Sequence, residues 1–257
     1  MNLPPLPFWH QLANAADRET MSRFRGDGVV ANKLERGFDP VTEADQRAER
    51  VIRSKIEARY PDHAILGEEY GASQRDALFR WVIDPIDGTR SFVAGLATWM
   101  TLIGLERDGR AVAGLASQPV TRERFVALGD GRAFVQRDGR CLGLATRKTG
   151  RPETAIVMTT DPFILYDDVA KLDRFRAEAQ LVRYGADAYA FCALAAGTVD
   201  VVFERGVQPH DVSALIPIIE AAGGLFTSWK GERPEAGGNV VAAATPALHE
   251  WALSILA

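Results

Sequence analysis

The chain has 257 residues, of which 47% are hydrophobic and 25% are charged, and its formal net charge is −4. That length allows a large core in one or two lobes, and the composition is typical of a soluble globular enzyme. Charges are spread without blocks and no apolar run approaches about 18 residues, so neither nucleic acid nor a membrane is an expected partner. The proline-rich start lacks the basic flank and apolar stretch of a signal peptide, which predicts a cytoplasmic protein.

The two cysteines, Cys141 and Cys192, are too few and too isolated for a disulfide framework or a thiolate metal site. Free cysteine is usually buried, so we expect both to be small side chains of the core. Neither is therefore included among the candidate site residues.

The first part of the chain has the period of helices. Residues 6–24 show a mixed helical pattern, and residues 43–59 show a clearer one with apolar side chains spaced by four: Ala44, Ala48, Ile52 and Ile56. Thr42 stands where an N-cap is expected, and Asp45 follows three residues later, as in a capping box. We therefore expect a helix from residue 43 to residue 59.

Strands dominate the middle of the chain. A short strand at 64–67 leads into the sequence "GEE". After residue 84, apolar runs separated by turn pairs predict an antiparallel meander: 98–106, 111–116, 125–128 and 133–136.

The pattern changes beyond residue 150, where strands alternate with helical segments. The expected elements are strands at 155–159 and 199–204 and helices at 187–196 and 211–222. The change predicts an N-terminal α+β lobe over residues 1–145 and a C-terminal α/β lobe over residues 146–257.

Acidic residues stand where strands stop or helices start: Asp45, Glu68 and Glu69, Asp84 and Asp87, and Asp211. Taken singly, each has an ordinary explanation. Asp45 sits in a first helical turn, Glu68 can be surface charge, and Asp211 can cap the helix that follows it. Acids at the ends of elements are nevertheless free to converge in the folded chain.

The stretch "RWVIDPIDGTRSF", residues 80–92, is not explained by capping. An apolar strand ends in Asp84 and Asp87, with Pro85 and Gly88 restricting the backbone between and after them. Carboxylates held this close repel one another unless a cation lies between them, and oxygen-only ligation favours Mg²⁺ over zinc. The residues from Gly88 onward resemble the first turn of a short helix, which suits a phosphate group. Together these features predict hydrolysis of a phosphate ester.

Four motifs in order, "PVTEAD", "GEE", "WVIDPIDGT" and "HDVSAL…AAGG", resemble the inositol monophosphatase family of Mg²⁺-dependent, lithium-sensitive phosphatases. The resemblance covers nearly the entire chain. It implies a layered α/β/α/β/α sandwich and a homodimer. It also implies that the N-terminal lobe carries most metal ligands and that the C-terminal lobe supplies Asp211 and the substrate-specificity residues.

The resemblance implies a site for two or three Mg²⁺ ions. Glu68, Asp84 and the backbone carbonyl of Ile86 would hold the first ion, and Asp84, Asp87 and Asp211 would hold the second. Glu68 and water would share a third, weaker ion.

The same resemblance assigns the remaining catalytic groups. Thr89, paired with Asp45, would orient and activate the attacking water, with Glu68 beside them. The amides of Gly88 and Thr89 would bind the phosphate, and Glu69 would lie behind the ligands. No covalent enzyme intermediate is implied.

Two other interpretations are possible. Phosphatases of the haloacid dehalogenase type need an Asp-x-Asp pair, whereas the spacing here is Asp-x-x-Asp. A Mg²⁺-dependent regulatory or binding module with this fold would be favoured by loss of Thr89 or Glu68, and both are present.

The segment "RYGADAYAF", residues 183–191, bears on which phosphate ester is the substrate. The resemblance implies that the substrate side of the pocket is formed by Arg183, Gly185 and Asp187. A carboxylate there favours a cationic substrate. Asp187 could instead cap the helix that follows it. Glu204, seven residues before Asp211, is a further candidate for contact with substrate, although it could pair with Arg183 or Arg205.

The runs "RYGAD-Y", "SFVAG…TWMTLIGL" and "SQPVTRERFVALGDG" are similar to the histidinol-phosphatase branch of this family. The substrate implied is L-histidinol phosphate, which carries an amine and an imidazole. Inositol-1-phosphate, or another sugar or nucleotide phosphate such as 3′-phosphoadenosine 5′-phosphate, is the second candidate.

The resemblance leaves the roles of four residues open. Ser117 replaces the acid of the branch's "DQP", and His210 occupies a place often held by Trp, where packing is the expected role. Arg90 could steer phosphate or form a salt bridge across a dimer. Lys33 resembles a lysine on a flexible loop near the third metal, although a solvated lysine is an equal interpretation.

Overall fold

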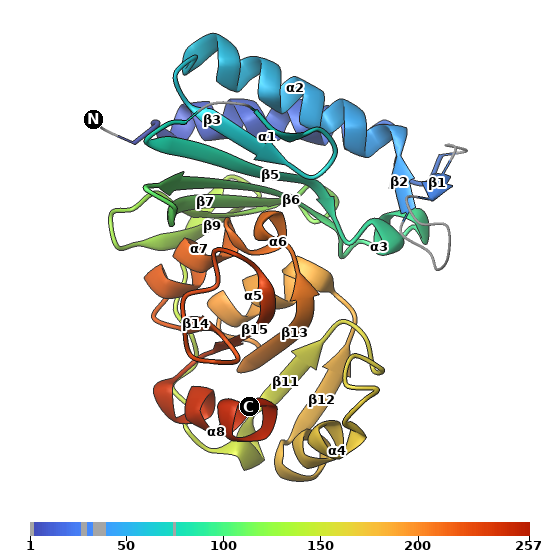
Figure 1. The fold of residues 1–257 in the computed structure, drawn as a ribbon, viewed down its shortest axis with the longest axis vertical. Coiled ribbons are helices and arrows are strands. Elements are labelled where there is room, and N and C mark those ends of the chain that lie inside the picture. Colours follow the sequence, from blue (N-terminus) through green and yellow to red (C-terminus); the bar gives the residue numbers. More distant parts are fainter. Residues whose placement is uncertain (1–2, 27–29, 33–39, 74–75) are drawn as a thin grey trace.

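Five layers of secondary structure are stacked along the long axis of the molecule (Figure 1). The computed structural model describes residues 3–26, 30–32, 40–73 and 76–257. From top to bottom in Figure 1, the layers are a helix pair, a large sheet, a group of short helices, a smaller sheet and a second helix pair. The α/β/α/β/α sandwich predicted from the sequence is confirmed.

The large sheet has eight strands in the order β10-β9-β8-β7-β6-β5-β3-β4. All neighbours pair antiparallel except β3 and β5, which are parallel, so the predicted meander is present. The strands are β3 (Ala64–Gly67), β4 (Gly71–Ala72), β5 (Phe79–Asp87), β6 (Met100–Arg107), β7 (Arg110–Gln118), β8 (Glu123–Ala127), β9 (Ala133–Arg137) and β10 (Arg140–Gly143).

Helices α1 (Leu6–Met21) and α2 (Glu43–Arg59) cover the upper face of this sheet (Figure 1). Their apolar sides pack on the sheet in a cluster that includes Trp9, Ile52 and Trp81. Burial of such side chains stabilises the fold by about 1.5–3 kcal/mol each. A separate two-stranded sheet, β1 (Val30–Asn32) and β2 (Pro40–Thr42), precedes α2.

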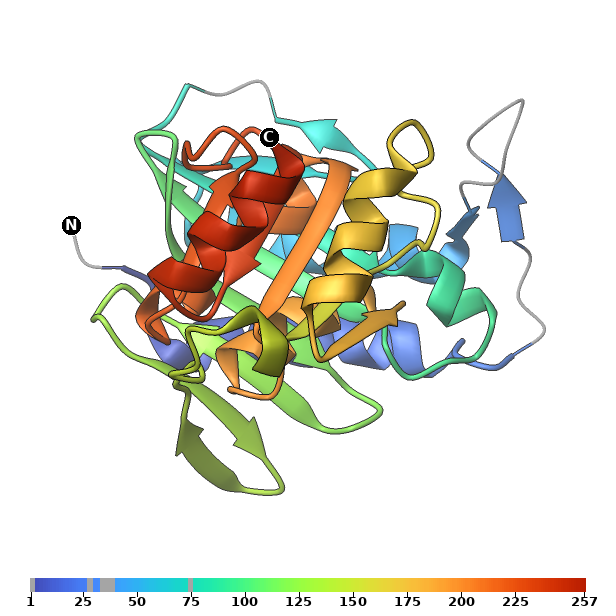
Figure 2. The same cartoon turned by 90° about the horizontal axis from the view of Figure 1, so that it is seen from below.

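The smaller sheet has five strands in the order β12-β11-β13-β15-β14. Short helices lie between the two sheets, and α4 and α8 lie on the outer face of the smaller one, as Figure 2 shows from below. The elements of this part are η1 (Pro152–Thr154), β11 (Ile156–Thr159), α4 (Val169–Glu178), β12 (Leu181–Tyr184), α5 (Asp187–Ala195), β13 (Val201–Val207), α6 (Pro209–Val212), α7 (Leu215–Ala221), β14 (Leu225–Ser228), β15 (Gly238–Ala243) and α8 (Pro246–Leu256).

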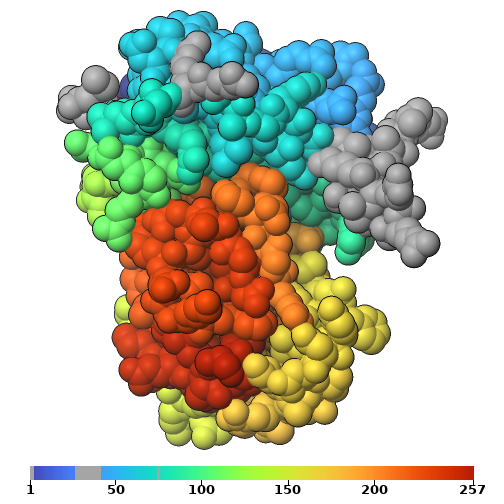
Figure 3. All heavy atoms as spheres, viewed as in Figure 1, coloured from blue at the N-terminus to red at the C-terminus, as the bar shows by residue number. Residues whose placement is uncertain are grey.

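The early and late parts of the chain lie one above the other. In Figure 3, atoms coloured blue to green mostly form the upper part of the molecule and atoms coloured yellow to red form the lower part. The boundary at residues 145 and 146 stays a prediction. In the part of the chain that the structure describes, no helix combines the length and apolar character needed to cross a membrane.

The start of α2 is fixed by the predicted capping box. The Ala44 amide donates to Oγ1 of Thr42 at 3.1 Å, and the Thr42 amide donates to Oδ2 of Asp45 at 2.8 Å. The interaction satisfies amides at the helix start and holds the Asp45 side chain in place.

Three expectations differ from the structure. Cys141 is exposed because β10 is the edge strand of the large sheet, whereas Cys192 is buried as expected. The helix expected at 211–222 is two helices, α6 and α7. Since α6 is capped by Gln208, Asp211 lies in its first turn and is not its N-cap.

Two glycines on adjacent strands let the C-terminal helices approach the large sheet closely. Gly104 of β6 and Gly114 of β7 are cross-strand partners. A Cβ atom on Gly104 would lie 2.6 Å from Oγ of Ser213, and one on Gly114 would lie 2.0 Å from the carbonyl oxygen of Ala214. Both contacts immediately follow α6, so this approach sets the distance between Asp211 and the end of β5.

We expect Gly114→Ala to lower the free energy of unfolding by about 1–3 kcal/mol or more, because the added methyl group would overlap backbone that cannot move alone. The measurement is urea denaturation followed by circular dichroism. Gly143→Ala is the matched control, since a Cβ there meets nothing within 4 Å. Equal denaturation midpoints for the two variants would contradict this account of the contact.

Candidate active site

A β-bulge near the end of β5 turns two acids toward one side of the sheet. Between Asp84 and Asp87 the pairing with β6 shifts register, so three steps on β5 match two on β6. Residues three apart in a regular strand point to opposite faces, and the extra residue restores a common face. Oγ1 of Thr101 donates to the carbonyl oxygen of Pro85 at 2.8 Å within this bulge. The bulge therefore lets Asp84 and Asp87 share one site.

Two more acids reach the same place from distant parts of the chain. Asp211 comes from α6, and its carboxylate joins those of Asp84 and Asp87 with oxygens that all lie within 4.8 Å of one another. Glu68, directly after β3, forms a second such group with Asp84 and His210. The four acids predicted as metal ligands therefore converge.

Backbone amides hold two of these carboxylates. The Ala188 amide of α5 donates to Oδ2 of Asp87 at 2.7 Å, and the Gln208 amide donates to Oδ2 of Asp211 at 2.7 Å. Hydrogen bonds of this kind fix the direction of a carboxylate without adding a positive charge.

The crowding of acids is electrostatically unfavourable. Burial raises the pKa of Asp84 well above its usual value, and the charges of Glu68, Asp87 and Asp211 raise it further. Burial, with the charges of Asp187 and Asp211, likewise raises the pKa of Asp87 well above its usual value. Burial also raises the pKa of Asp211. A cation among these groups would relieve both the desolvation and the repulsion.

The donor set fits a hard divalent cation such as Mg²⁺. Three carboxylates and a fourth at Glu68 supply oxygen, and Ile86 is among the residues that line the same cavity. Oxygen ligands in this number are those that Mg²⁺ prefers in proteins. These residues therefore fit the magnesium that the sequence resemblance implies.

Glu49, which sequence analysis did not identify, positions the loop that carries Glu68. It is fully buried on α2 and accepts hydrogen bonds from the amide of Glu69 at 2.7 Å and the amide of Tyr70 at 3.2 Å. Arg53 pairs with it at 2.6 Å. Glu49 is one of several charged residues on the predicted helix, and nothing in the sequence marks it. Its contact with the loop of Glu68 is therefore visible only in the fold.

Thr89 and Asp45 lie close together, as predicted for the pair that orients water. Oγ1 of Thr89 is 3.0 Å from the carbonyl oxygen of Ile86 and 3.5 Å from Oδ1 of Asp45. Burial raises the pKa of Asp45 to about 6, against the opposing hydrogen bonds from Thr42. A carboxylate with this pKa is mostly ionised at neutral pH and remains able to accept a proton.

Gly88 forms the turn between β5 and α3 (Thr89–Val93). Its φ of 77° favours glycine, and a Cβ there would lie 2.8 Å from Oδ2 of Asp187. Oδ2 of Asp187 also accepts a hydrogen bond from Oγ of Ser91 at 3.0 Å. The Asp187 carboxylate therefore lies directly against the segment predicted to bind phosphate.

The backbone at Asp187 is strained. Ala186 has a φ of 85° and Asp187 a φ of 45°, both in the left-handed region that side chains rarely adopt. Ala186 is the N-cap of α5, so the alternative role of Asp187 as the cap is wrong. Burial raises the pKa of Asp187, and the hydrogen bond from Ser91 and the charge of Arg90 oppose the shift.

Glu204 is buried on β13 and lines the same cavity as Asp187. Its Oε1 accepts a hydrogen bond from the Thr160 amide at 2.6 Å. Burial raises the pKa of Glu204 to about 8. Of the arginines considered as its partner, Arg205 instead pairs with Asp167.

The four converging acids, with Thr89, Asp187 and Glu204, line a cavity of about 400 Å³ beside the end of β5, and Asp45 is not part of its lining. The described residues that line it do not include Arg183 or Gly185, and Arg183 is exposed on β12. Their roles in substrate binding stay predictions. Lys33 lies outside the described residues. Arg90 lines the cavity beside Thr89.

His210, for which the sequence predicts a packing role, also lines this cavity, and that role stays a prediction. Its Nε2 lies 3.5 Å from Oδ1 of Asp211. The signal that could have found it is its position immediately before a predicted metal ligand.

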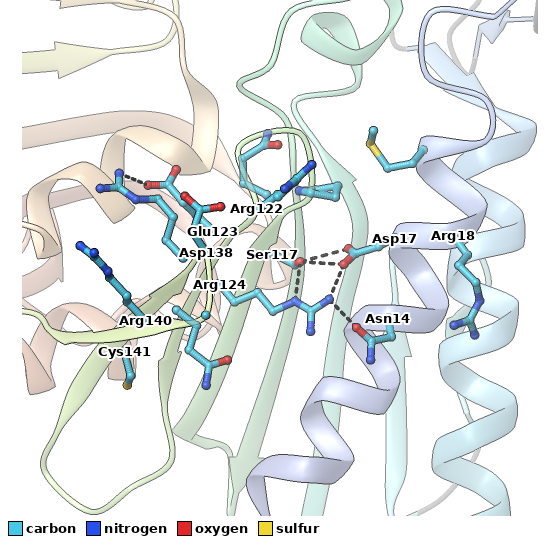
Figure 4. A pocket seen from close by; sticks show the side chains of 16 residues that line it. Asn14, Asp17, Arg18, Ser117, Arg122, Glu123, Arg124, Asp138, Arg140 and Cys141 are labelled. Carbon is cyan, nitrogen blue, oxygen red and sulfur yellow. Dashed lines mark hydrogen bonds and ion pairs between the residues drawn. The ribbon is translucent and has the colours of Figure 1, made fainter.

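A second cavity, of about 750 Å³, lies elsewhere, among α1, β8 and the hairpin of β9 and β10. Figure 4 shows Arg124 reaching from the large sheet to Asp17 and Asn14 of α1. Ser117 joins this network, with Oγ 3.0 Å from Oδ1 of Asp17. Ser117 does not line the cavity that holds the acid cluster, so its departure from the branch motif leaves that cavity wall unchanged.

Comparison with known proteins gives a consistent result. A family model described as the inositol monophosphatase family matches residues 6–257. The bifunctional phosphatase IMPL2, chloroplastic, of Arabidopsis thaliana is 37% identical over 257 residues, covering 95% of this chain and 72% of that protein. The histidinol-phosphatase of Chlorobaculum parvum is 33% identical over 232 residues, covering 90% of this chain and 88% of that protein.

The fold has a similar match among solved structures. An inositol monophosphatase from Zymomonas mobilis aligns with a TM-score of 0.85 and 34% identity. The alignment covers 97% of this chain and 96% of that chain.

We expect the stability of the metal-free protein to fall as pH rises from about 4.5 to about 8, partly because of Glu204. The folded chain keeps a proton on Glu204 that the unfolded chain has lost in this window, so raising the pH favours unfolding. Each unit of pKa difference is worth about 1.4 kcal/mol, which predicts an effect of a few kcal/mol. The measurement is the melting temperature by calorimetry across this pH range in a chelating buffer. Glu204→Gln should flatten the profile, and an unchanged slope would contradict the assignment.

Proposed function

The chain belongs to the inositol monophosphatase family and is therefore a phosphoric monoester hydrolase, and on that premise we propose that it hydrolyses L-histidinol phosphate to L-histidinol and phosphate. The observation that carries the choice of substrate is the pair of extra acids, Asp187 and Glu204, in the cavity of the acid cluster. A carboxylate can accept hydrogen bonds from the hydroxyl groups of a polyol, but its hydrogen bonds to a cationic amine or imidazolium are stronger because both partners are charged.

Two or three Mg²⁺ ions per active site are the proposed cofactor. Glu68, Asp84, Asp87 and Asp211, with the carbonyl of Ile86, would hold them. When bound, such ions neutralise charge on the phosphate and lower the pKa of water. The convergence of the four carboxylates supports this assignment.

The protein's own groups then have separate tasks. The amides of Gly88 and Thr89 bind phosphate oxygens, and the lack of a Cβ at Gly88 lets this backbone lie close to the Asp187 carboxylate. Oγ1 of Thr89 orients the water for direct attack on phosphorus. Asp45, with a pKa of about 6, takes up the proton that Thr89 passes on.

Asp187 and Glu204 recognise the part of the substrate that is released as the alcohol. In the substrate-free cavity the pKa of Glu204 is about 8, so it is largely neutral at pH 7. A cationic group beside it favours the ionised form, which strengthens the hydrogen bond between them. Arg183 and Gly185, on the segment that leads to Asp187, stay secondary candidates for contact with substrate.

Inositol-1-phosphate is the second candidate substrate, and the similarity to an inositol monophosphatase from Zymomonas mobilis favours it. The nucleotide 3′-phosphoadenosine 5′-phosphate is a further alternative. A homodimer and inhibition by lithium remain predictions that rest on the family resemblance, and the cytoplasmic location remains a prediction from the sequence at the start of the chain.

The substrate proposal is tested by phosphate release from a panel: L-histidinol phosphate, inositol-1-phosphate, fructose-1,6-bisphosphate and 3′-phosphoadenosine 5′-phosphate, each with and without Mg²⁺. The proposal expects the highest kcat/KM on L-histidinol phosphate, and only with Mg²⁺. A higher value on another ester would remove the substrate assignment. No hydrolysis of any ester would favour a regulatory or binding module.

We expect Asp84→Asn to lower kcat by orders of magnitude, because Asp84 belongs to both groups of converging ligands. The same variant should melt at a higher temperature than the parent in metal-free buffer, since a buried Asn does not incur the desolvation and charge repulsion that raise the pKa of Asp84. Phosphate release and calorimetry give the two readouts. Near-normal turnover would contradict the metal site.

Asp187→Asn should raise KM for L-histidinol phosphate about 10- to 100-fold, as expected for loss of a hydrogen bond between charged groups. Glycerol phosphate, which has no cationic group, should show a change below about threefold. Asp138→Asn, on an exposed turn away from this cavity, removes the same charge and serves as the control. Equal losses on both substrates would discard the specificity role of Asp187.

A further inference from the structure

One nitrogen ligand lies within reach of the acid cluster. Among the described residues, the ring of His210 offers a nitrogen that lies within 4.8 Å of carboxylate oxygens of both Glu68 and Asp84. Adjacent ligands of one octahedral cation, each at about 2.1 Å from it, lie about 3 Å apart, and opposite ligands lie about 4.2 Å apart. Movements of up to about 2 Å at the side-chain ends would therefore bring all three atoms to one ion.

The backbone holds His210 in this position. It is the second residue of α6, after Pro209, and Gln208 and Asp211 close a capping box around it. The imidazole side chain is only 16% exposed, so it faces the cavity more than the solvent. A short helix fixed in this way presents an imidazole and a carboxylate from adjacent residues to the same cluster.

We propose that His210 is a ligand of the cation that Glu68 and Asp84 hold, which makes this a mixed nitrogen and oxygen site. The inference rests on the proposed metal centre. Imidazole binds first-row transition ions better than it binds Mg²⁺, which keeps oxygen ligands. The site therefore favours an ion such as Mn²⁺ over Mg²⁺ more strongly than a set of carboxylates alone.

An ion pair between His210 and Asp211 is the competing explanation. The 3.5 Å separation of Nε2 and Oδ1 would suit a protonated ring. If both ring nitrogens carry protons, the imidazole cannot bond to the ion, whereas a neutral ring could donate from Nε2 to Asp211 and bind the ion through Nδ1. The two explanations differ in whether a nitrogen is bonded to the metal, which can be measured directly.

The test uses the full chain, stripped of metal and titrated with Mn²⁺, and pulsed electron paramagnetic resonance to detect directly bound ¹⁴N. We expect nitrogen modulation in the parent protein and its loss in His210→Asn. The ratio of Mn²⁺ to Mg²⁺ affinity should fall about tenfold or more in this variant. His10→Asn, on α1 and outside the cavity, is the control and should keep both properties.

The outcomes separate this inference from the function on which it rests. Mn²⁺ that binds without nitrogen modulation would overturn the role of His210 and leave the carboxylate site intact. Failure of the parent protein to bind Mn²⁺ at all would overturn the metal centre itself, and the role of His210 with it.

Discussion

Mutual repulsion among buried carboxylates is the constraint on which the rest of the structure depends. Glu68, Asp84, Asp87 and Asp211 come from three separate segments and converge at one end of β5. Burial and neighbouring charge raise the pKa values of the aspartates, so the cluster is unfavourable as long as no cation neutralises it. The cluster lowers the stability of the cation-free protein, and such a cost is typical of a site that binds a ligand.

Three features of the surrounding structure bring the acids together. The bulge in β5 gives Asp84 and Asp87 a common direction, and the paired glycines Gly104 and Gly114 let the segment after α6 lie on the sheet. Glu49, buried on α2, holds the loop of Glu68 from the other side. The glycine contacts join segments far apart in the chain, so the large sheet and the segment that carries Asp211 are both needed for one site.

Much of this could be predicted from sequence where the signal is local. The capping box at Thr42, the meander and the acids at element ends are marked by spacing within a few residues, and the structure has them. The register of the bulge, the burial of Glu49 and the entry of His210 into the cluster depend on contacts between distant segments. The exposure of Cys141 has the same origin, because only the order of strands makes β10 an edge.

The most direct test of the central claim is calorimetric titration of the metal-free protein with Mg²⁺ near pH 7.5 in buffers of different ionisation enthalpy. If buried carboxyl groups hold protons until a cation replaces them, binding must release protons and raise the melting temperature. Saturable heat with net proton release is the predicted result. Absence of binding, or binding with no proton released, would contradict the account.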